Sequence, residues 1–325
     1  MMLRPLSLLV AGCALISSLN GTPPLIIAHR GASGYLPEHT LESAAYAHAL
    51  HADYIEQDVV MSRDDVLVVL HDIHIDTTTD VASRFPKRHR ADGRFYAVDF
   101  DWAELKSLSV RERFNPATDQ PVFPARFPAT PAAFRLCTME AQLQLIAGLN
   151  RSTSRRVGVY PEIKAPSWHH AEGKDPGTAL ISLLAKYGYA NANDPAFVQC
   201  FEADELVRLR ESTGTTLRFV QLVGQDNVDL LTATNLPRVA RYAQGIGPHI
   251  GQVLYHDGTP RPTVNLAHQF GLVVHPYTVR ADALPPGLTD MNTLLELLFD
   301  GAGVDGVFTD HTDRAVAFLA PSRPD

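Results

Sequence analysis

The chain has 325 residues, of which 45% are hydrophobic and 20% charged, and its formal net charge at pH 7 is −8. This composition is that of a globular protein with a full core, and it excludes an intrinsically disordered chain. The acidic balance argues against nucleic acid as a partner, because nucleic-acid binding needs a basic surface. Length alone permits one large α/β domain or two smaller ones.

The first element in chain order is the segment 1–23, which has the layout of a secretory signal. Arg4 is followed by an apolar run over 6–19 and then by small, turn-forming residues. This run is too short for a permanent transmembrane span. The sequence around Cys13 resembles a bacterial lipobox, so a lipid anchor is an alternative to soluble release. We expect export to the periplasm, with soluble release favoured and a mature domain over 24–325.

Beyond the leader, short β-branched runs alternate with helical patterns. Such alternation implies parallel strand pairing, either in an open doubly wound sheet or in a barrel. Nine runs are one too many for eight barrel strands, but only MSRDD separates the second from the third. That leaves no room for a crossover helix, so these two runs form a hairpin. The prediction is a (β/α)8 TIM barrel with one extra hairpin arm. The predicted strands are 25–29, 54–60, 66–71, 157–163, 196–201, 217–223, 245–248, 272–279 and 306–310.

The segment of about 79–136 interrupts this repeat. It lacks clean periodicity and holds five prolines between Pro116 and Pro131. We interpret it as a small insertion after the second-strand hairpin, at the mouth of the barrel, and not as a separate folding domain. Long loops at that end of a barrel usually shape access to the site.

Polar residues stand at the ends of several predicted strands, where the active site of a (β/α) barrel is built. Strand side chains alternate between faces, so Glu56 and Asp58 share one face, as do Glu162 and Lys164. Pairing the hairpin about its turn sets Glu56 roughly opposite His71. The strand-end groups are His29-Arg30, Glu56 with Asp58, His71-Asp72, and Glu162 with Lys164.

Glu56, Asp58 and Glu162 form a set of oxygen ligands for a metal ion. An isolated Glu is more often a surface or salt-bridged residue, but three converging carboxylates without a cation would be severely unfavourable. Oxygen ligands suit Ca²⁺ or Mg²⁺ better than zinc or copper. Cys137 and Cys200 are too few for a thiolate zinc cage, and we expect Cys200 to be a buried free thiol.

The chain has 14 histidines, so a lone histidine carries little information. His29 and His71 differ from the others because each ends a buried strand, and two imidazoles can serve as base and acid in one displacement. Arg30 can bind a phosphate through two hydrogen bonds, and Lys164 adds a point charge. These groups and a divalent metal suit phosphoryl transfer. Structural roles are assigned to His39, His48, His51, His89, His169 and His249.

The longer motifs IIAHRGASGYLPEHTLES, YIEQDVVMSRDDVLVVLHD and YPEIKAPSWHH resemble those of glycerophosphodiester phosphodiesterases, in particular the periplasmic branch. The similarity continues through QCFEADEL, VVHPYTVR and GVFTD. It implies a (β/α) barrel with an insertion after the HD motif, and hydrolysis of glycerophosphodiesters to sn-glycerol 3-phosphate and an alcohol. It also implies general acid/base roles for His29 and His71, and phosphate binding by Arg30 with Lys164 as a second cation. By the same resemblance Glu56, Asp58 and Glu162 are metal ligands, commonly of calcium.

One position departs from the family pattern. Relatives often read PENT where this chain has His39 within PEHT, and we assign His39 no catalytic role, whereas Glu38 is expected to support the site. Two alternatives are a barrel enzyme that attacks intact phospholipids and a non-catalytic barrel protein. The first would need a membrane-docking face, for which we find no amphipathic basic helix or aromatic cluster. The second would have lost a histidine or a carboxylate, and none is lost.

Overall fold

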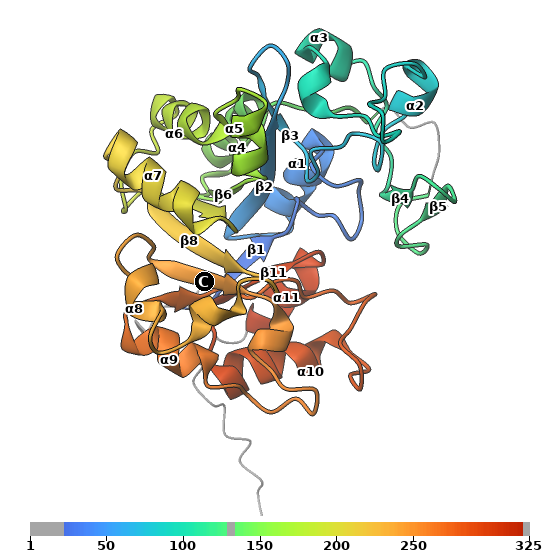
Figure 1. The fold of residues 1–325 in the computed structure, drawn as a ribbon. Helices are drawn as coiled ribbons and strands as arrows, with labels where there is room; N and C mark the ends of the chain where they lie inside the picture. Colours follow the sequence, from blue (N-terminus) through green and yellow to red (C-terminus); the bar gives the residue numbers. More distant parts are fainter. Residues whose placement is uncertain (1–22, 129–133, 321–325) are drawn as a thin grey trace, which may run out of the picture.

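The computed structural model describes residues 23–128 and 134–320. Eight parallel strands lie in the spatial order β10-β9-β8-β7-β6-β2-β1-β11. The two end strands meet across a seam where the N–H of Asp305 donates to the carbonyl of Val274 and that of Phe308 to Pro276. This nearly closed sheet confirms the TIM-barrel prediction (Figure 1). The strands are β1 (Leu25–Ala28), β2 (Tyr54–Met61), β6 (Gly158–Ile163), β7 (Phe197–Cys200), β8 (Arg218–Val223), β9 (Gly245–Pro248), β10 (Val273–Val274) and β11 (Gly306–Thr309).

The predicted hairpin is present, and its second arm β3 (Leu67–Val69) pairs with β2 in antiparallel fashion outside the barrel path. Val59 lies opposite Val69. Continuing this register sets His71 opposite Gln57, so the predicted pairing with Glu56 was wrong by one residue. The cause is that Met61, the first residue of MSRDD, still pairs with Leu67 in the sheet. The turn therefore begins one residue later than predicted.

Helices cover the outside of the barrel (Figure 1). Several begin at a side chain that caps their free N–H groups: Thr40 accepts from the N–H of Ser43, and Thr138 from that of Ala141. The outward-facing strand residues and the inner helix faces together form the largest hydrophobic cluster. The outer helices are α1 (Leu41–Ala49), α4 (Met139–Thr153), α5 (Pro166–Ala171), α6 (Pro176–Lys186), α7 (Ala203–Thr213), α8 (Leu236–Val239), α9 (Thr263–Gln269), α10 (Met291–Glu296) and α11 (Thr312–Leu319).

A smaller cluster fills the barrel interior. Its rings pack in contact, with the centroid of Tyr160 lying 4.8 Å from Phe197 and 5.0 Å from Phe308. This apolar layer closes the barrel below the strand ends, so inward-facing residues further along each strand lie above it and define the floor of a site. The buried members of the layer are Ile27, Tyr54, Tyr160, Phe197, Val220 and Phe308.

The segment between β3 and α4 lies at one side of the barrel and contains α2 (Val81–Arg84), α3 (Trp102–Leu105), β4 (Phe114–Asn115) and β5 (Gln120–Pro121) (Figure 1). It has a third hydrophobic cluster, in which Phe100, Leu105 and Leu108 are fully buried. This cluster also includes Val60 and Val68 of the hairpin. The insertion therefore packs on the β2–β3 hairpin.

Cys137 and Cys200 are buried free thiols, as expected for Cys200. In the described part of the chain, no helix is long and apolar enough to cross a bilayer. The predicted leader and Cys13 lie outside the described residues.

Candidate active site

The site lies at the C-terminal ends of the barrel strands and follows from strand periodicity. Two residues beyond Ile27, Tyr54 and Tyr160 of the interior layer, the chain places His29, Glu56 and Glu162 on the same inward face. A cavity of about 180 Å³ opens above the layer. Six predicted site residues line it: His29, Arg30, Glu56, His71, Glu162 and Lys164.

Asp58, the seventh predicted residue, is buried beside the cavity with an exposed fraction of 1%. Carboxylate oxygens of Glu56, Asp58 and Glu162 all lie within 4.8 Å of one another. This cluster arises because Asp58 and Glu162 are direct neighbours in the β2–β6 pairing. The structure thus brings the three predicted carboxylates together.

The protonation of these carboxylates is strongly perturbed. Burial and the neighbouring Asp58 hold the pKa of Glu56 well above its usual range, and burial likewise raises that of Glu162 to about 8. Burial opposes ionisation of Asp58 as well, but Lys164 and nearby histidines hold the pKa of that carboxyl well below normal. Nζ of Lys164 lies 2.7 Å from Glu162 Oε1 and 3.6 Å from Asp58 Oδ1. Arg30 Nε also lies 3.4 Å from Asp58 Oδ2. Because Arg30 pairs with Glu38 as well, Lys164 and Arg30 together neutralise the three close carboxylates only in part.

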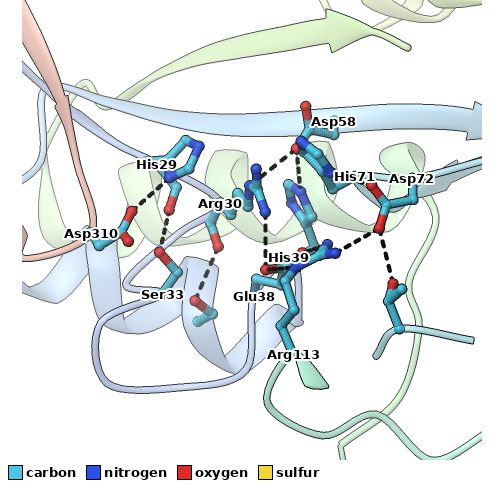
Figure 2. Close-up of polar contacts among 12 residues, drawn as sticks. His29, Arg30, Ser33, Glu38, His39, Asp58, His71, Asp72, Arg113 and Asp310 are labelled. Carbon is cyan, nitrogen blue, oxygen red and sulfur yellow. Dashed lines mark hydrogen bonds and ion pairs between the residues drawn. The ribbon is translucent and has the colours of Figure 1, made fainter. Parts of the chain in front are cut away.

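Each predicted catalytic histidine is bound by a carboxylate. Nδ1 of His29 donates to Asp310 Oδ1 at 2.6 Å, and Nδ1 of His71 donates to Asp72 Oδ1 at 2.6 Å (Figure 2). A carboxylate acceptor fixes the ring proton on Nδ1 and leaves Nε2 as the nitrogen available to a substrate. In Figure 2 the two rings stand on either side of Arg30.

Both imidazoles are poor proton acceptors before a substrate binds. Burial, followed by the charge of Arg30, lowers the pKa of His29 to about 4. Burial together with Arg30 and Lys164 lowers that of His71 to about 3. Burial, with the added effect of Arg30 on both rings, therefore keeps the two imidazoles neutral at pH 7.

Arg30 is held by a turn that the local sequence specifies. Its backbone has a positive φ of 58°, and its N–H donates to Glu56 Oε2 at 2.6 Å. The next residue, Gly31, has a φ of 80°, and a Cβ there would lie 2.5 Å from Ser43 Oγ. Only glycine fits this position without displacing helix α1. Nη1 of Arg30 also donates to Glu38 Oε2 at 3.1 Å, so Glu38 supports the site as expected.

His39, to which we assigned a structural role, lies nearer to the site than its loop position indicated. Nε2 of His39 lies 2.7 Å from Asp58 Oδ2, and the side chain is nearly fully buried. The ring therefore contacts a predicted metal ligand directly. The sequence misled because a positive φ of 63° turns this loop residue inward, and no periodicity predicts such a turn.

Several further residues of the site were not predicted. His249 lines the cavity, although we expected it to be structural, and so do Gln199, Tyr277 and Arg280. The strand rule that found His29 would also have found His249, two residues beyond the inward position of Gly247. Phe308 also belongs to the interior layer, so the same rule predicts that Asp310, two residues later, faces the site.

A second group of possible metal ligands, His170, Asp175 and Glu205, lies on the outer helices. Arg208 already forms ion pairs with both carboxylates, at 2.8 Å to Asp175 and 2.7 Å to Glu205. The arginine supplies the positive charge that this group requires.

A wider groove of about 570 Å³ adjoins the catalytic cavity and shares His249, Thr278 and Arg280 with it. Its walls come from the loops after β9 and β10. Leu254 and Leu284 supply apolar surface, and the guanidinium of Arg261 stacks 4.1 Å from the ring of Tyr255. The groove gives space next to the reacting centre for a group of variable size.

Comparison with known proteins agrees with this geometry. Residues 29–314 match the Glycerophosphoryl diester phosphodiesterase family. A glycerophosphodiester phosphodiesterase of Haemophilus influenzae is 41% identical, with 95% of each chain covered, and one of Treponema pallidum is 36% identical, with 97% of this chain and 95% of the relative covered.

Solved structures share the fold. The crystal structure of an Oleispira antarctica phosphodiesterase in complex with the product sn-glycerol-3-phosphate superposes with a TM-score of 0.65 at 20% identity, covering 94% of this chain and 100% of that one. The crystal structure of a glycerophosphodiester phosphodiesterase from Agrobacterium tumefaciens superposes with a TM-score of 0.60 at 22% identity. This match covers 90% of this chain and 99% of that one. With the full-length relatives, these matches show that the chain belongs to the glycerophosphoryl diester phosphodiesterase family and is a phosphodiesterase.

Proposed function

We propose that this enzyme hydrolyses glycerophosphodiesters to sn-glycerol 3-phosphate and an alcohol, with a divalent metal ion and the pair His29 and His71. The observation that supports this most directly is the pair of carboxylate-bound imidazoles flanking Arg30 above three clustered carboxylates. The Oleispira relative, which was crystallised with sn-glycerol-3-phosphate, makes this half of the substrate the natural candidate for the cavity.

The proposed chemistry is an in-line displacement at phosphorus. As the new P–O bond forms, one neutral imidazole accepts at Nε2 the proton of the attacking group, which is water or a hydroxyl of the substrate. As the old P–O bond breaks, the other imidazole, which enters the step protonated at Nε2 because the bound phosphate anion raises its pKa, donates that proton to the departing alkoxide. Two rings on opposite sides of the phosphate can do this in one step, which a single ring can hardly do. Arg30 and Lys164 neutralise charge on the phosphate oxygens.

Glu56, Asp58 and Glu162 are the residues that would hold the metal, which supplies further charge neutralisation at the phosphate when bound. Asp58 Oδ1 is a buried oxygen without a hydrogen-bond donor, and its two neighbours are carboxylates with raised pKa values. A cation there would satisfy this oxygen and would offset the burial and the mutual repulsion that raise those pKa values. Oxygen-only ligands fit Ca²⁺ best, with Mg²⁺ as the alternative.

We expect the enzyme to tolerate different head groups. The identified cations address the phosphate, and the adjoining groove leaves room for the alcohol. A dedicated choline site would need several clustered aromatic rings, whereas the ring of Tyr255 in the groove is stacked with Arg261. Glycerophosphocholine, glycerophosphoethanolamine and glycerophosphoglycerol should therefore be hydrolysed at comparable rates.

The test is an enzyme-coupled assay of released glycerol 3-phosphate with each of the three diesters, with the His29→Ala protein as the control for contaminating hydrolases. Absence of glycerol 3-phosphate as a product would refute the proposed function. A preference of about a thousandfold for one diester would refute only the head-group prediction. It would indicate a specificity pocket formed by residues other than those named above for the groove.

A further inference from the structure

We propose that the insertion positions both catalytic histidines through Arg113 and Arg126, each of which fixes the carboxylate that binds one of the two rings. This inference rests on the proposed roles of His29 and His71. It assigns the insertion a part in catalysis.

The first arginine acts on His71. Nη1 of Arg113 donates to Asp72 Oδ2 at 2.6 Å, while Oδ1 of the same carboxylate accepts from His71 (Figure 2). The guanidinium also donates to both oxygens of Glu38, at 2.6 and 3.1 Å. With Thr77 donating to Oδ2 as well, the carboxylate is held from the side opposite the ring. Asp72 cannot rotate without breaking a charge-assisted hydrogen bond.

The second arginine acts on His29 in the same way. Nη2 of Arg126 donates to Asp310 Oδ2 at 2.6 Å, while Oδ1 accepts from His29. The guanidinium also pairs with Asp282, at 2.8 and 3.0 Å. Its side chain is only 4% exposed, so this arginine has been removed from water to reach the barrel. Arg280 donates to the same oxygen of Asp310 at 2.7 Å.

One short piece of the insertion supplies both contacts. Arg113 immediately precedes β4, Arg126 follows β5, and the two strands pair as a hairpin. The hairpin is extended by a hydrogen bond from the N–H of Val122 to the carbonyl of Arg113. Because the hairpin joins the two arginines, the same element orients the carboxylates at both sides of the phosphate site.

Fixing the carboxylate matters because a histidine in proton transfer must present Nε2 at a set angle. A carboxylate that is hydrogen-bonded only to the imidazole can rotate together with that ring. A carboxylate that is also hydrogen-bonded to a guanidinium has a fixed orientation and so fixes the orientation of the imidazole. Loss of the outer partner that orients a metal-bound histidine typically costs about 10–100-fold in metal affinity or activity, and we expect a similar range for partners that orient a catalytic histidine. We expect Arg113→Met to lower kcat by that factor with KM changed only a few-fold. The decrease in kcat for Arg126→Met should be near the lower end of this range, because Arg280 would still donate a hydrogen bond to Asp310.

A matched control exists in the same insertion. Arg94 also forms two hydrogen bonds with a buried carboxylate, that of Asp76, both at 2.7 Å. Asp76 has no hydrogen bond with His29 or His71 among those found in the described residues. Arg94→Met should therefore leave kcat within about twofold of the wild type, even if it lowers the melting temperature.

The decisive experiment is a set of double-mutant cycles. If Arg113 acts through His71, Arg113→Met should have almost no further effect on kcat in the His71→Ala protein but should keep its effect in the His29→Ala protein. Arg126→Met should show the reverse pattern. An effect of either arginine that persists in its own histidine background would overturn the proposal, and so would effects that vanish equally in both backgrounds.

A second measurement does not depend on turnover. A Nδ1 proton bound to a carboxylate gives a separate downfield proton resonance, which the two His→Ala proteins would assign. Arg113→Met should shift or broaden the His71 resonance and leave that of His29 unchanged, with the converse for Arg126→Met. Unchanged resonances in both variants would overturn the positioning role even if the proposed hydrolysis holds. Selective shifts would support it even if another diester proves to be the substrate.

Discussion

Replacing His29 or His71 with alanine should lower kcat for glycerophosphocholine by about 10²–10⁴, because each ring is expected to carry one proton transfer in the displacement. Fold and metal affinity should change little, since neither ring belongs to the carboxylate cluster. Steady-state kinetics, circular dichroism and metal titration would measure these three properties. His170→Ala is the control, because that ring lies on the outer helices. His39→Ala is unsuitable as a control because His39 contacts Asp58.

An activated substrate should separate the two roles. An aryl leaving group hardly needs a proton, so the variant that lacks the acid should keep near wild-type kcat on an aryl diester but not on glycerophosphocholine. The variant that lacks the base should be slow on both. If both alanine variants kept most of their activity on the natural substrate, the histidine mechanism would be wrong.

The pH dependence follows from the charges beside the rings. In the free enzyme the pKa values of His29 and His71 are lowered to about 4 and about 3, so both rings are neutral at pH 7. A bound phosphodiester anion offsets Arg30 and Lys164, and the pKa of each ring should rise. The basic limb of the kcat profile, which reports the complex, should therefore lie at higher pH than that of kcat/KM, which reports the free enzyme. Coincident basic limbs would contradict this.

Exhaustive chelation should abolish activity, and added Ca²⁺ should restore it better than Zn²⁺. The reason is the crowding of Glu56, Asp58 and Glu162 within 4.8 Å, which Lys164 and Arg30 neutralise only in part. Elemental analysis must confirm that metal has been removed. Full activity of the stripped protein would refute metal dependence and would imply that these two cations are sufficient counter-charges.

The same cluster gives a test that does not use activity. If the three carboxylates hold a metal, Ca²⁺ should raise the melting temperature of the stripped protein. In Glu162→Gln this shift should be much smaller, because one charged ligand has been replaced by a neutral oxygen. An equal calcium shift in Glu162→Gln would place the metal elsewhere.

Much of the site could be predicted because strand geometry connects sequence to space directly. Every second residue of a strand faces the same way, so a polar residue following an inward apolar one must lie at the barrel mouth. This rule brought together His29, Glu56 and Glu162, which are spread over more than a hundred residues of the chain. His249 was missed because the inward positions before it, Gly245 and Gly247, carry no side chain that would mark the inward face.

The insertion contacts could not be predicted, and the reason is also geometric. Arg113 binds Glu38, 75 residues away, and Arg126 binds Asp310, 184 residues away. Neither arginine lies on a periodic element, so no local pattern fixes its direction. Their positions depend on ion pairs with carboxylates that are distant in the sequence.

The hydrophobic cluster of the insertion has a consequence for the response of the enzyme to heat. Phe100, Leu105 and Leu108 pack within the insertion and on the hairpin, and the barrel core does not depend on them. Such a segment can unfold locally at a lower free energy than the whole chain. Because it carries Arg113 and Arg126, local unfolding would remove the two positioning arginines from Asp72 and Asp310 while the barrel stays intact. Thermal inactivation should thus precede global melting, with amides of the insertion exchanging hydrogen faster than those of β6.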